Sequence, residues 1–168
     1  MAEQFNVDEV FEIAEQIERN GAKFYRRSAQ VAADPEARGL LVELADMEDR
    51  HERVFAAMRE DLRREDPEWL PKFSDADGEN QAALYLRAVA EGRVFDLKGD
   101  PAADVSEDTS LPSILQIAIG LEKESVVFYL GIKEAMPPGL GWEKLDNIIR
   151  EEMGHVASLT QQLAALGG

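Results

Sequence analysis

The most constraining feature of this chain is an internal repeat of four chemically distinctive residues at a constant offset of 104 positions. Both histidines of the protein fall inside the repeat, and each has a glutamate three residues before it. The first copy contains Glu18, Tyr25, Glu48 and His51, and the second copy contains Glu122, Tyr129, Glu152 and His155. The repeat predicts two similar halves that contribute the same side chains to one site.

The spacing within each Glu-x-x-His motif fits a metal site on a helix. Positions i and i+3 of an α-helix lie about 60° apart around its axis, so both side chains can reach one ion. A separate helix that adds one further glutamate to each half gives four carboxylates and two imidazoles, a set that suits iron or manganese better than calcium. The candidate metal ligands are Glu18, Glu48, His51, Glu122, Glu152 and His155.

The simplest alternative is that both histidines are ordinary buried residues. That alternative must also account for four carboxylates on the same helix faces, and burying such charges is costly unless they take up protons or find a partner. Arg50 and Arg150 adjoin the motifs, but each is expected to point elsewhere on its helix. A bound metal is therefore the simpler interpretation.

Apolar residues at helical spacing predict four long helices, at about 7–33, 35–64, 112–136 and 142–166. Asp34 and Pro35 are expected at the N-cap and the first position of the second helix. The segment 65–110 is rich in Asp, Gly and Pro, and we expect a long crossover that contains one short helix from about Glu79 to Glu91. The crossover joins two antiparallel helix hairpins and makes the third long helix parallel to the second. Residues 1–168 are expected to form a single domain.

Composition narrows the classes of function. A net charge of −16 argues against nucleic acid and against an anionic membrane surface as partners. The apolar runs are too short to span a bilayer. The absence of cysteine excludes disulfides and cysteine-ligated metal centres within this sequence. Since the first residues also lack the pattern of an export signal, we expect a cytoplasmic protein.

These residues resemble the rubrerythrin branch of the ferritin-like superfamily over nearly the whole chain. The matching pattern is a glutamate followed seven positions later by tyrosine on the first and third long helices, with Glu-x-x-His on the second and fourth. Ferritin-like di-iron carboxylate proteins build their site from this combination of helices. The resemblance implies an all-α, ferritin-like four-helix bundle with two iron ions as its cofactor, for which manganese or zinc are possible substitutes.

The resemblance also implies a role for each repeated residue. Glu18 and Glu122 would be terminal ligands, and Glu48 and Glu152 would bridge the two metals. The two histidines would complete the ligand set.

Tyr25 and Tyr129 would lie just outside the ligands. Helix geometry agrees, because a residue seven positions on lies about 10.5 Å further along the axis. A buried phenol needs a hydrogen-bond partner, and the carboxylate of a facing helix is the expected one. The alternative for each is an ordinary core tyrosine.

Two departures from the family affect what the resemblance implies. Full-length rubrerythrins have a rubredoxin-like domain with four cysteines, which this chain cannot build, so the electrons must come from a separate donor. They also have an additional glutamate three residues after the ligand on the third helix, where this chain has Ser125. Glu124 is turned about 160° from Glu122 around the helix, and we expect it to face solvent.

The expected function is therefore that of a di-iron oxidoreductase of the ferroxidase or peroxidase type, which oxidises ferrous iron with O2 or hydrogen peroxide and protects against oxidative stress. The alternatives are a non-catalytic protein of iron storage or delivery, and a structural metal-binding bundle. A zinc-filled structural site would give binding and stability without redox turnover. A homo-oligomer is expected, with a dimer favoured over a cage.

Overall fold

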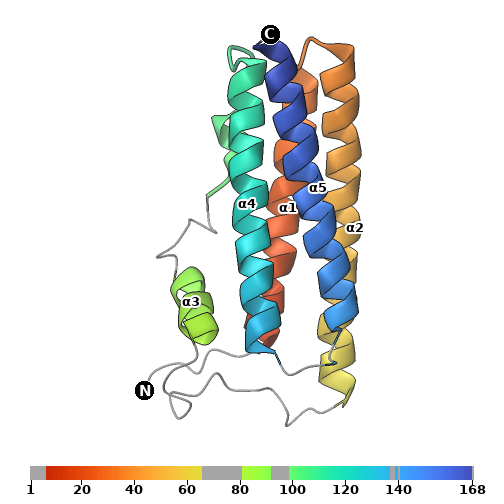
Figure 1. Ribbon diagram of the computed structural model, residues 1–168, viewed down its shortest axis with the longest axis vertical. Helices are drawn as coiled ribbons and strands as arrows, with labels where there is room; N and C mark the ends of the chain where they lie inside the picture. The colour runs from red at the N-terminus through yellow and green to blue at the C-terminus, as the bar shows by residue number, and fades with distance from the viewer. Residues whose placement is uncertain (1–6, 66–80, 92–98, 137–138, 140, 168) are drawn as a thin grey trace.

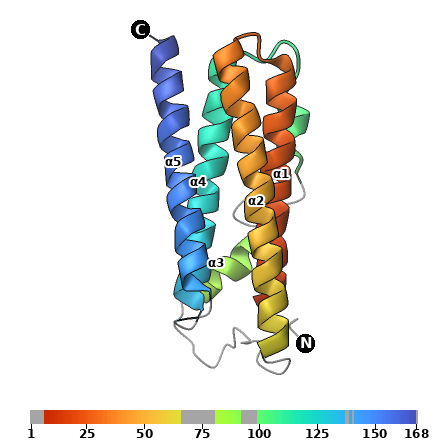
Figure 2. The same ribbon diagram turned by 90° about the vertical axis from the view of Figure 1, so that its right-hand side faces the viewer.

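The computed structural model describes residues 7–65, 81–91, 99–136, 139 and 141–167. All elements in this part of the chain are helical, and four long helices form a bundle (Figures 1 and 2). None of these helices is long and apolar enough to cross a membrane. The elements are α1 (Val7–Val31), α2 (Pro35–Glu65), α3 (Gln81–Ala90), the 3₁₀ helix η2 (Pro101–Asp104), α4 (Leu111–Ala135) and α5 (Trp142–Leu166). The predicted all-α four-helix bundle is confirmed.

The helix directions follow the expected topology of two hairpins. In Figure 1, α1 and α5 run from the bottom of the view to the top, whereas α2 and α4 run from the top to the bottom. The third long helix, α4, is therefore parallel to α2. Within each hairpin the packing is close, α1 against α2 and α4 against α5. The short helix expected in the crossover is α3, and residues 66–80 and 92–98 of the crossover lie outside the described residues.

Side-chain caps and a left-handed glycine mark the beginnings of three helices. The Asp34 carboxylate accepts a hydrogen bond of 2.8 Å from the backbone N–H of Ala37, which confirms Asp34 as the N-cap of α2. The Ser110 hydroxyl accepts one of 3.3 Å from the backbone N–H of Ser113 and caps α4. Gly141 precedes α5 with a φ of 75°, in the left-handed region that favours glycine.

The sequence repeat is also a repeat of structure. Helix α1 begins at Val7 and ends at Val31, and α4 begins at Leu111 and ends at Ala135. The first residues of α1 and α4 are therefore 104 positions apart, and so are their last residues, which is the offset of the repeated residues. Glu18 and Glu122 consequently occupy the same position along α1 and α4.

The core consists of two apolar clusters with the polar residues between them. On α1, Phe11 belongs to one cluster and Phe24 to the other, and Glu18 lies between them. On α2, α4 and α5 the site residues likewise lie between residues of the two clusters. One cluster includes Phe11, Phe55, Phe128 and Leu145, and the other includes Phe24, Leu41, Leu115 and Leu159. Apolar packing on both sides thus shields the middle of the bundle from water.

Replacing Asp34 with alanine should lower the free energy of unfolding of the metal-free protein by about 1 kcal/mol, because the N-terminus of α2 loses its capping hydrogen bond. Urea unfolding followed by circular dichroism measures this loss. Glu43→Ala, at an exposed position on α2, is the control and should change the unfolding free energy by less than half as much. Equal effects of both variants would contradict the capping role.

Candidate metal centre

The structure brings all six predicted ligands together in the middle of the bundle. Their side chains come from all four long helices, and each residue is at most 4% exposed. Potential ligand atoms lie within 4.8 Å of one another in two groups, Glu18, Glu48, His51 and Glu152 in one, and Glu48, Glu122, Glu152 and His155 in the other. Glu48 and Glu152 belong to both groups, as side chains that bridge two metals would.

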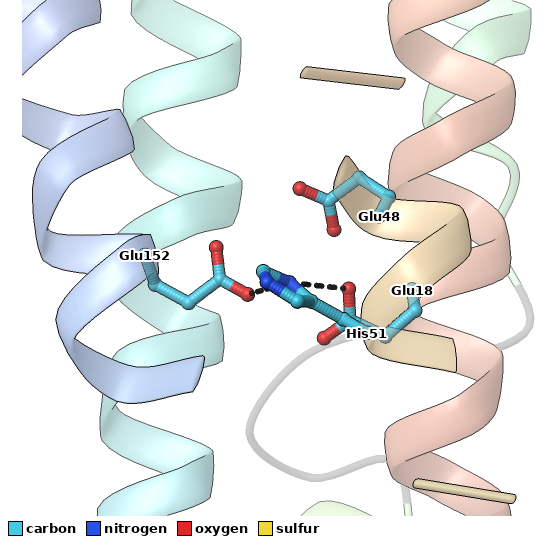
Figure 3. Close-up of side chains that lie close together, drawn as sticks. All are labelled: Glu18, Glu48, His51 and Glu152. Carbon is cyan, nitrogen blue, oxygen red and sulfur yellow. Dashed lines mark ion pairs between the residues drawn. The ribbon is translucent and has the colours of Figure 1, made fainter. Parts of the chain in front are cut away.

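The first group surrounds the imidazole of His51. Figure 3 shows Glu152 from α5 and Glu18 from α1 pointing toward this ring, with Glu48 beside them. The Nδ1 atom of His51 lies 3.0 Å from Oε1 of Glu152 and 3.5 Å from Oε2 of Glu18. One ring nitrogen of His51 therefore faces the carboxylates.

The second group repeats this arrangement around His155. Its Nδ1 atom lies 2.8 Å from Oε2 of Glu152, 3.4 Å from Oε2 of Glu122 and 3.6 Å from Oε1 of Glu48. The two imidazole rings stack with centroids 5.9 Å apart and an angle of 21° between their planes. The Nδ1 atoms of both histidines thus point into the same cluster of carboxylates.

The two tyrosines hydrogen-bond across the bundle. The Tyr25 hydroxyl on α1 donates to the Glu122 carboxylate on α4, and the Tyr129 hydroxyl on α4 donates to the Glu18 carboxylate on α1. The expected hydrogen bond to a carboxylate of a facing helix is therefore present in both halves. Burial raises the pKa of both phenols well above the ordinary value, so both remain neutral donors.

Burial controls the protonation of the carboxylates in the metal-free site. It raises the pKa of Glu18 and of Glu48 well above the ordinary value and the pKa of Glu122 to about 7. Burial would also raise the pKa of Glu152, but the adjacent imidazoles of His155 and His51 lower it to about 2. Glu152 is therefore fully ionised at neutral pH when no metal is bound, whereas Glu122 is only partly ionised.

The histidines respond to the carboxylates around them. Burial alone would lower the pKa of His51, but the neighbouring Glu152 outweighs it and raises the pKa to about 9. For His155, Glu122 and Glu152 likewise outweigh burial and raise the pKa to about 10. At neutral pH the metal-free site therefore contains two imidazolium rings, which must lose their inward protons before they can ligate a metal.

Several inward-facing atoms of the site have no hydrogen-bond partner within the described part of the chain. They are Oε2 of Glu18, Oε1 of Glu48, both carboxylate oxygens of Glu152 and Nδ1 of His51 and His155. Their close contacts are the ion pairs that they form with one another, and buried polar atoms are seldom left without a hydrogen bond. All six are atoms that can ligate a cation, so the residues present fit two metal ions.

A chamber of about 370 Å³ lies beside the carboxylates. It reaches Glu48 and Glu122 at its inner end, and Asp100 and Asp104 of the η2 region contribute to its wall. Much of the rest of its wall consists of pairs of residues related by the repeat, namely Ile17 and Leu121, Asn20 and Glu124, and Gly21 and Ser125. Because these pairs come from α1 and α4, the chamber lies between the equivalent helices of the two halves.

Small residues keep this chamber open. A Cβ atom at Gly21 would lie 3.1 Å from Oε2 of Glu48, so even alanine there would press on a candidate ligand. The Ser125 hydroxyl donates to the backbone carbonyl of Leu121 on its own helix. Glu124 is exposed, as expected, and belongs to neither ligand group.

Sequence reasoning missed two residues that contact the outer faces of the histidines. Nε2 of His51 lies 2.6 Å from Oε2 of Glu151, and Nε2 of His155 lies 3.3 Å from the sulfur of Met47. Each precedes a Glu-x-x-His motif by one position, which places it on a different side of its own helix. Only the packing of α2 and α5 reveals these contacts.

Comparisons with known proteins agree with the fold described above. Residues 2–59 match the family model described as Rubrerythrin. A search of curated proteins finds no match. The solved structure of a candidate ferritin-like diiron-carboxylate protein from Thermotoga maritima matches with a TM-score of 0.66 and 21% identity, over 98% of this chain and 98% of that chain. The chain therefore has a ferritin-like fold, and the resemblance to rubrerythrins is supported.

The metal-free protein should lose thermal stability as the pH rises from 7 to 10. The folded pKa values of His51 and His155, about 9 and 10, lie above the ordinary value of 6.5, so within this window the folded state holds protons that the unfolded chain has lost. Stability then falls with rising pH. The raised pKa values of Glu18 and Glu48 act in the same direction, whereas the lowered pKa of Glu152 matters only below pH 4.5.

Melting temperatures of chelator-treated protein at several pH values measure this effect. The double variant His51→Ala, His155→Ala is the control and should show a flatter dependence between pH 7 and 10. A melting temperature that stays constant or rises over this range in the unaltered chain would contradict the assignment.

Proposed function

We propose that this protein binds two iron ions in the bundle core and reduces O2 or hydrogen peroxide as ferrous iron is oxidised. The observation that carries the proposal is the pair of buried ligand groups that share Glu48 and Glu152 and that include six atoms without a hydrogen bond. The ferritin-like fold and the match of residues 2–59 to the rubrerythrin model support it.

The donor set balances the charge of two divalent ions. Glu18 and His51 would hold one ion, Glu122 and His155 would hold the other, and the two shared carboxylates would bridge them. Four ionised carboxylates contribute −4, which two divalent ions cancel while both histidines are neutral. Metal binding would thereby remove the cost of four buried carboxylates.

Iron supplies the redox chemistry: two ferrous ions that give up one electron each can reduce O2 to hydrogen peroxide, or hydrogen peroxide to water, with uptake of two protons. The protein residues supply position and environment. Tyr25 and Tyr129 hold the carboxylates of Glu122 and Glu18 by hydrogen bonds. The apolar clusters shield the site from water along both directions of the bundle axis.

The chamber gives a small oxidant a way to approach. Its inner end includes carboxylates of the site, and Ile17 and Leu121 contribute apolar wall. At about 370 Å³ it has more room than O2 or peroxide requires, since one molecule of liquid water occupies about 30 Å³. A separate electron donor returns the iron to the ferrous state in this proposal.

Anaerobic titration of the metal-free protein with ferrous iron should show two ions bound per chain. His51→Ala should lose the ion held by Glu18 and His51, because an alanine offers no ligand atom. Calorimetry and iron analysis after desalting count the ions. The melting temperature should also rise with iron, because ligand at 100 times its Kd stabilises the folded state by about 2.7 kcal/mol. Binding of fewer than two ions by the unaltered chain would contradict the di-iron site.

The iron-loaded protein should consume O2 or peroxide faster than free ferrous iron does, and Ser125→Leu should slow this consumption severalfold by filling the chamber. The number of bound ions should stay at two. Stopped-flow absorbance and an oxygen electrode measure the rates. Val127→Leu, at an exposed position on the same helix, is the matched control and should leave the rate unchanged.

The same experiment separates the redox proposal from its alternatives. Two bound ions without accelerated consumption of either oxidant would exclude the oxidoreductase and leave storage, delivery or a structural role. A rate that is equal in Ser125→Leu and Val127→Leu would instead reject the chamber as the path of the oxidant.

A further inference from the structure

The metal centre is close to twofold symmetric, and its departures from symmetry are therefore informative. Several contacts are equivalent in the two halves: Tyr25 and Tyr129 each donate to the carboxylate of the opposite half, and Nδ1 of His51 and of His155 lies 3.5 Å from Glu18 and 3.4 Å from Glu122, respectively. One departure lies at the shared carboxylates, because Nδ1 of both histidines lies closest to Glu152 rather than to its repeat equivalent Glu48. A difference between equivalent positions then marks a difference between the two metal positions.

The clearest such difference lies at the outer nitrogens of the histidines. Glu151 and Met47 occupy equivalent positions of the repeat (151 − 47 = 104). Glu151 on α5 contacts Nε2 of His51 on α2 at 2.6 Å, and Met47 on α2 contacts Nε2 of His155 on α5 at 3.3 Å. One histidine thus faces a carboxylate where its counterpart faces a thioether.

These two partners affect an imidazole differently. A histidine that ligates through Nδ1 keeps its proton on Nε2 and can donate it to an outer acceptor. A carboxylate accepts this hydrogen bond strongly, fixes the tautomer and the ring orientation, and makes the ligating nitrogen a better donor to the metal. A thioether sulfur is a weak acceptor. Only Nε2 of His51 therefore has an anionic hydrogen-bond acceptor.

The contact also differs from an ordinary surface ion pair. The Glu151 side chain is 49% exposed, but the His51 side chain that it meets is 3% exposed and lies between Glu151 and the ligand carboxylates. Glu151 consequently acts on the metal position through a buried ring whose other nitrogen faces the site. The Met47 side chain is partly buried, and it contacts His155 through an uncharged sulfur.

We infer that the two metal positions are inequivalent, and that Glu151 is a positioning residue that makes the position formed by Glu18 and His51 bind its ion more tightly and fill first. The inference rests on the proposed function, because it requires two ions in the bundle. It assigns the weaker, more readily exchanged position to Glu122 and His155.

Anaerobic calorimetry of the full metal-free chain with ferrous iron tests this assignment. The unaltered chain should bind two ions in two steps whose Kd values differ by about 10- to 100-fold, the usual effect of an outer carboxylate on a ligating histidine. Glu151→Met should weaken the tight step by that factor and leave the weak step unchanged, so that the two steps converge. Glu151→Gln, which keeps a neutral acceptor, should weaken the tight step less.

The repeat offers a reciprocal variant. Met47→Glu should tighten the weak step, and the double variant Glu151→Met, Met47→Glu should move the tight step to His155. His51→Ala should then remove the tight step from the unaltered chain and the weak step from the double variant. A loss of folding cannot produce this exchange, and the melting temperature of each metal-free variant checks the fold independently.

Glu143→Met, which removes a charge from an exposed position on the same helix, controls for the general loss of negative charge. It should leave the ratio of the two Kd values unchanged. Two ions bound by Glu151→Met with both Kd values as in the unaltered chain, or with both weakened equally, would overturn the inference and leave the proposed function standing. Failure of the unaltered chain to bind two ions would overturn both.

Discussion

The burial of four carboxylates in the middle of a helical bundle is the constraint on which the rest of this structure depends. Glu18, Glu48, Glu122 and Glu152 are each at most 4% exposed, and apolar clusters lie on both sides of them. Isolated charges at this depth would destabilise the fold. The metal-free site reduces the charge by raised carboxyl pKa values and by two imidazolium rings. Cations at the centre would provide compensation that leaves the carboxylates ionised.

The same residues connect the two halves of the molecule. Helices pack most closely within each hairpin, and the hairpins meet each other over fewer contacts. The site residues and the two tyrosine hydrogen bonds cross this boundary, since Tyr25 reaches Glu122 and Tyr129 reaches Glu18. Ions bound by both groups would join α1 and α2 to α4 and α5. Packing therefore gathers the candidate ligands, and their hydrogen bonds and ion pairs connect the two hairpins.

The sequence predicted those features that depend on local geometry. The i, i+3 spacing of Glu48 and His51 requires only that the segment be helical, and Asp34 is a cap because of its place before Pro35. The equal offsets of the two motifs then predicted the six candidate ligands, which the structure brings together. The contacts of Glu151 and Met47 could not be predicted in this way, because they depend on how α2 and α5 pack together. The chamber likewise depends on where η2 lies against α1.

The residues around the chamber limit the charge that the protein itself can supply. Gly21 and Ser125 occupy equivalent positions three residues after Glu18 and Glu122, where a longer acidic side chain could approach the site. Gly21 has no side chain, and the Ser125 hydroxyl is bonded to its own helix. Within the described residues no fifth carboxylate joins the two ligand groups. The four carboxylates therefore match two divalent ions, and oxidation of those ions would create positive charge that must be balanced by groups outside this set. The chamber beside Glu48 and Glu122 is the space in which solvent can approach the site.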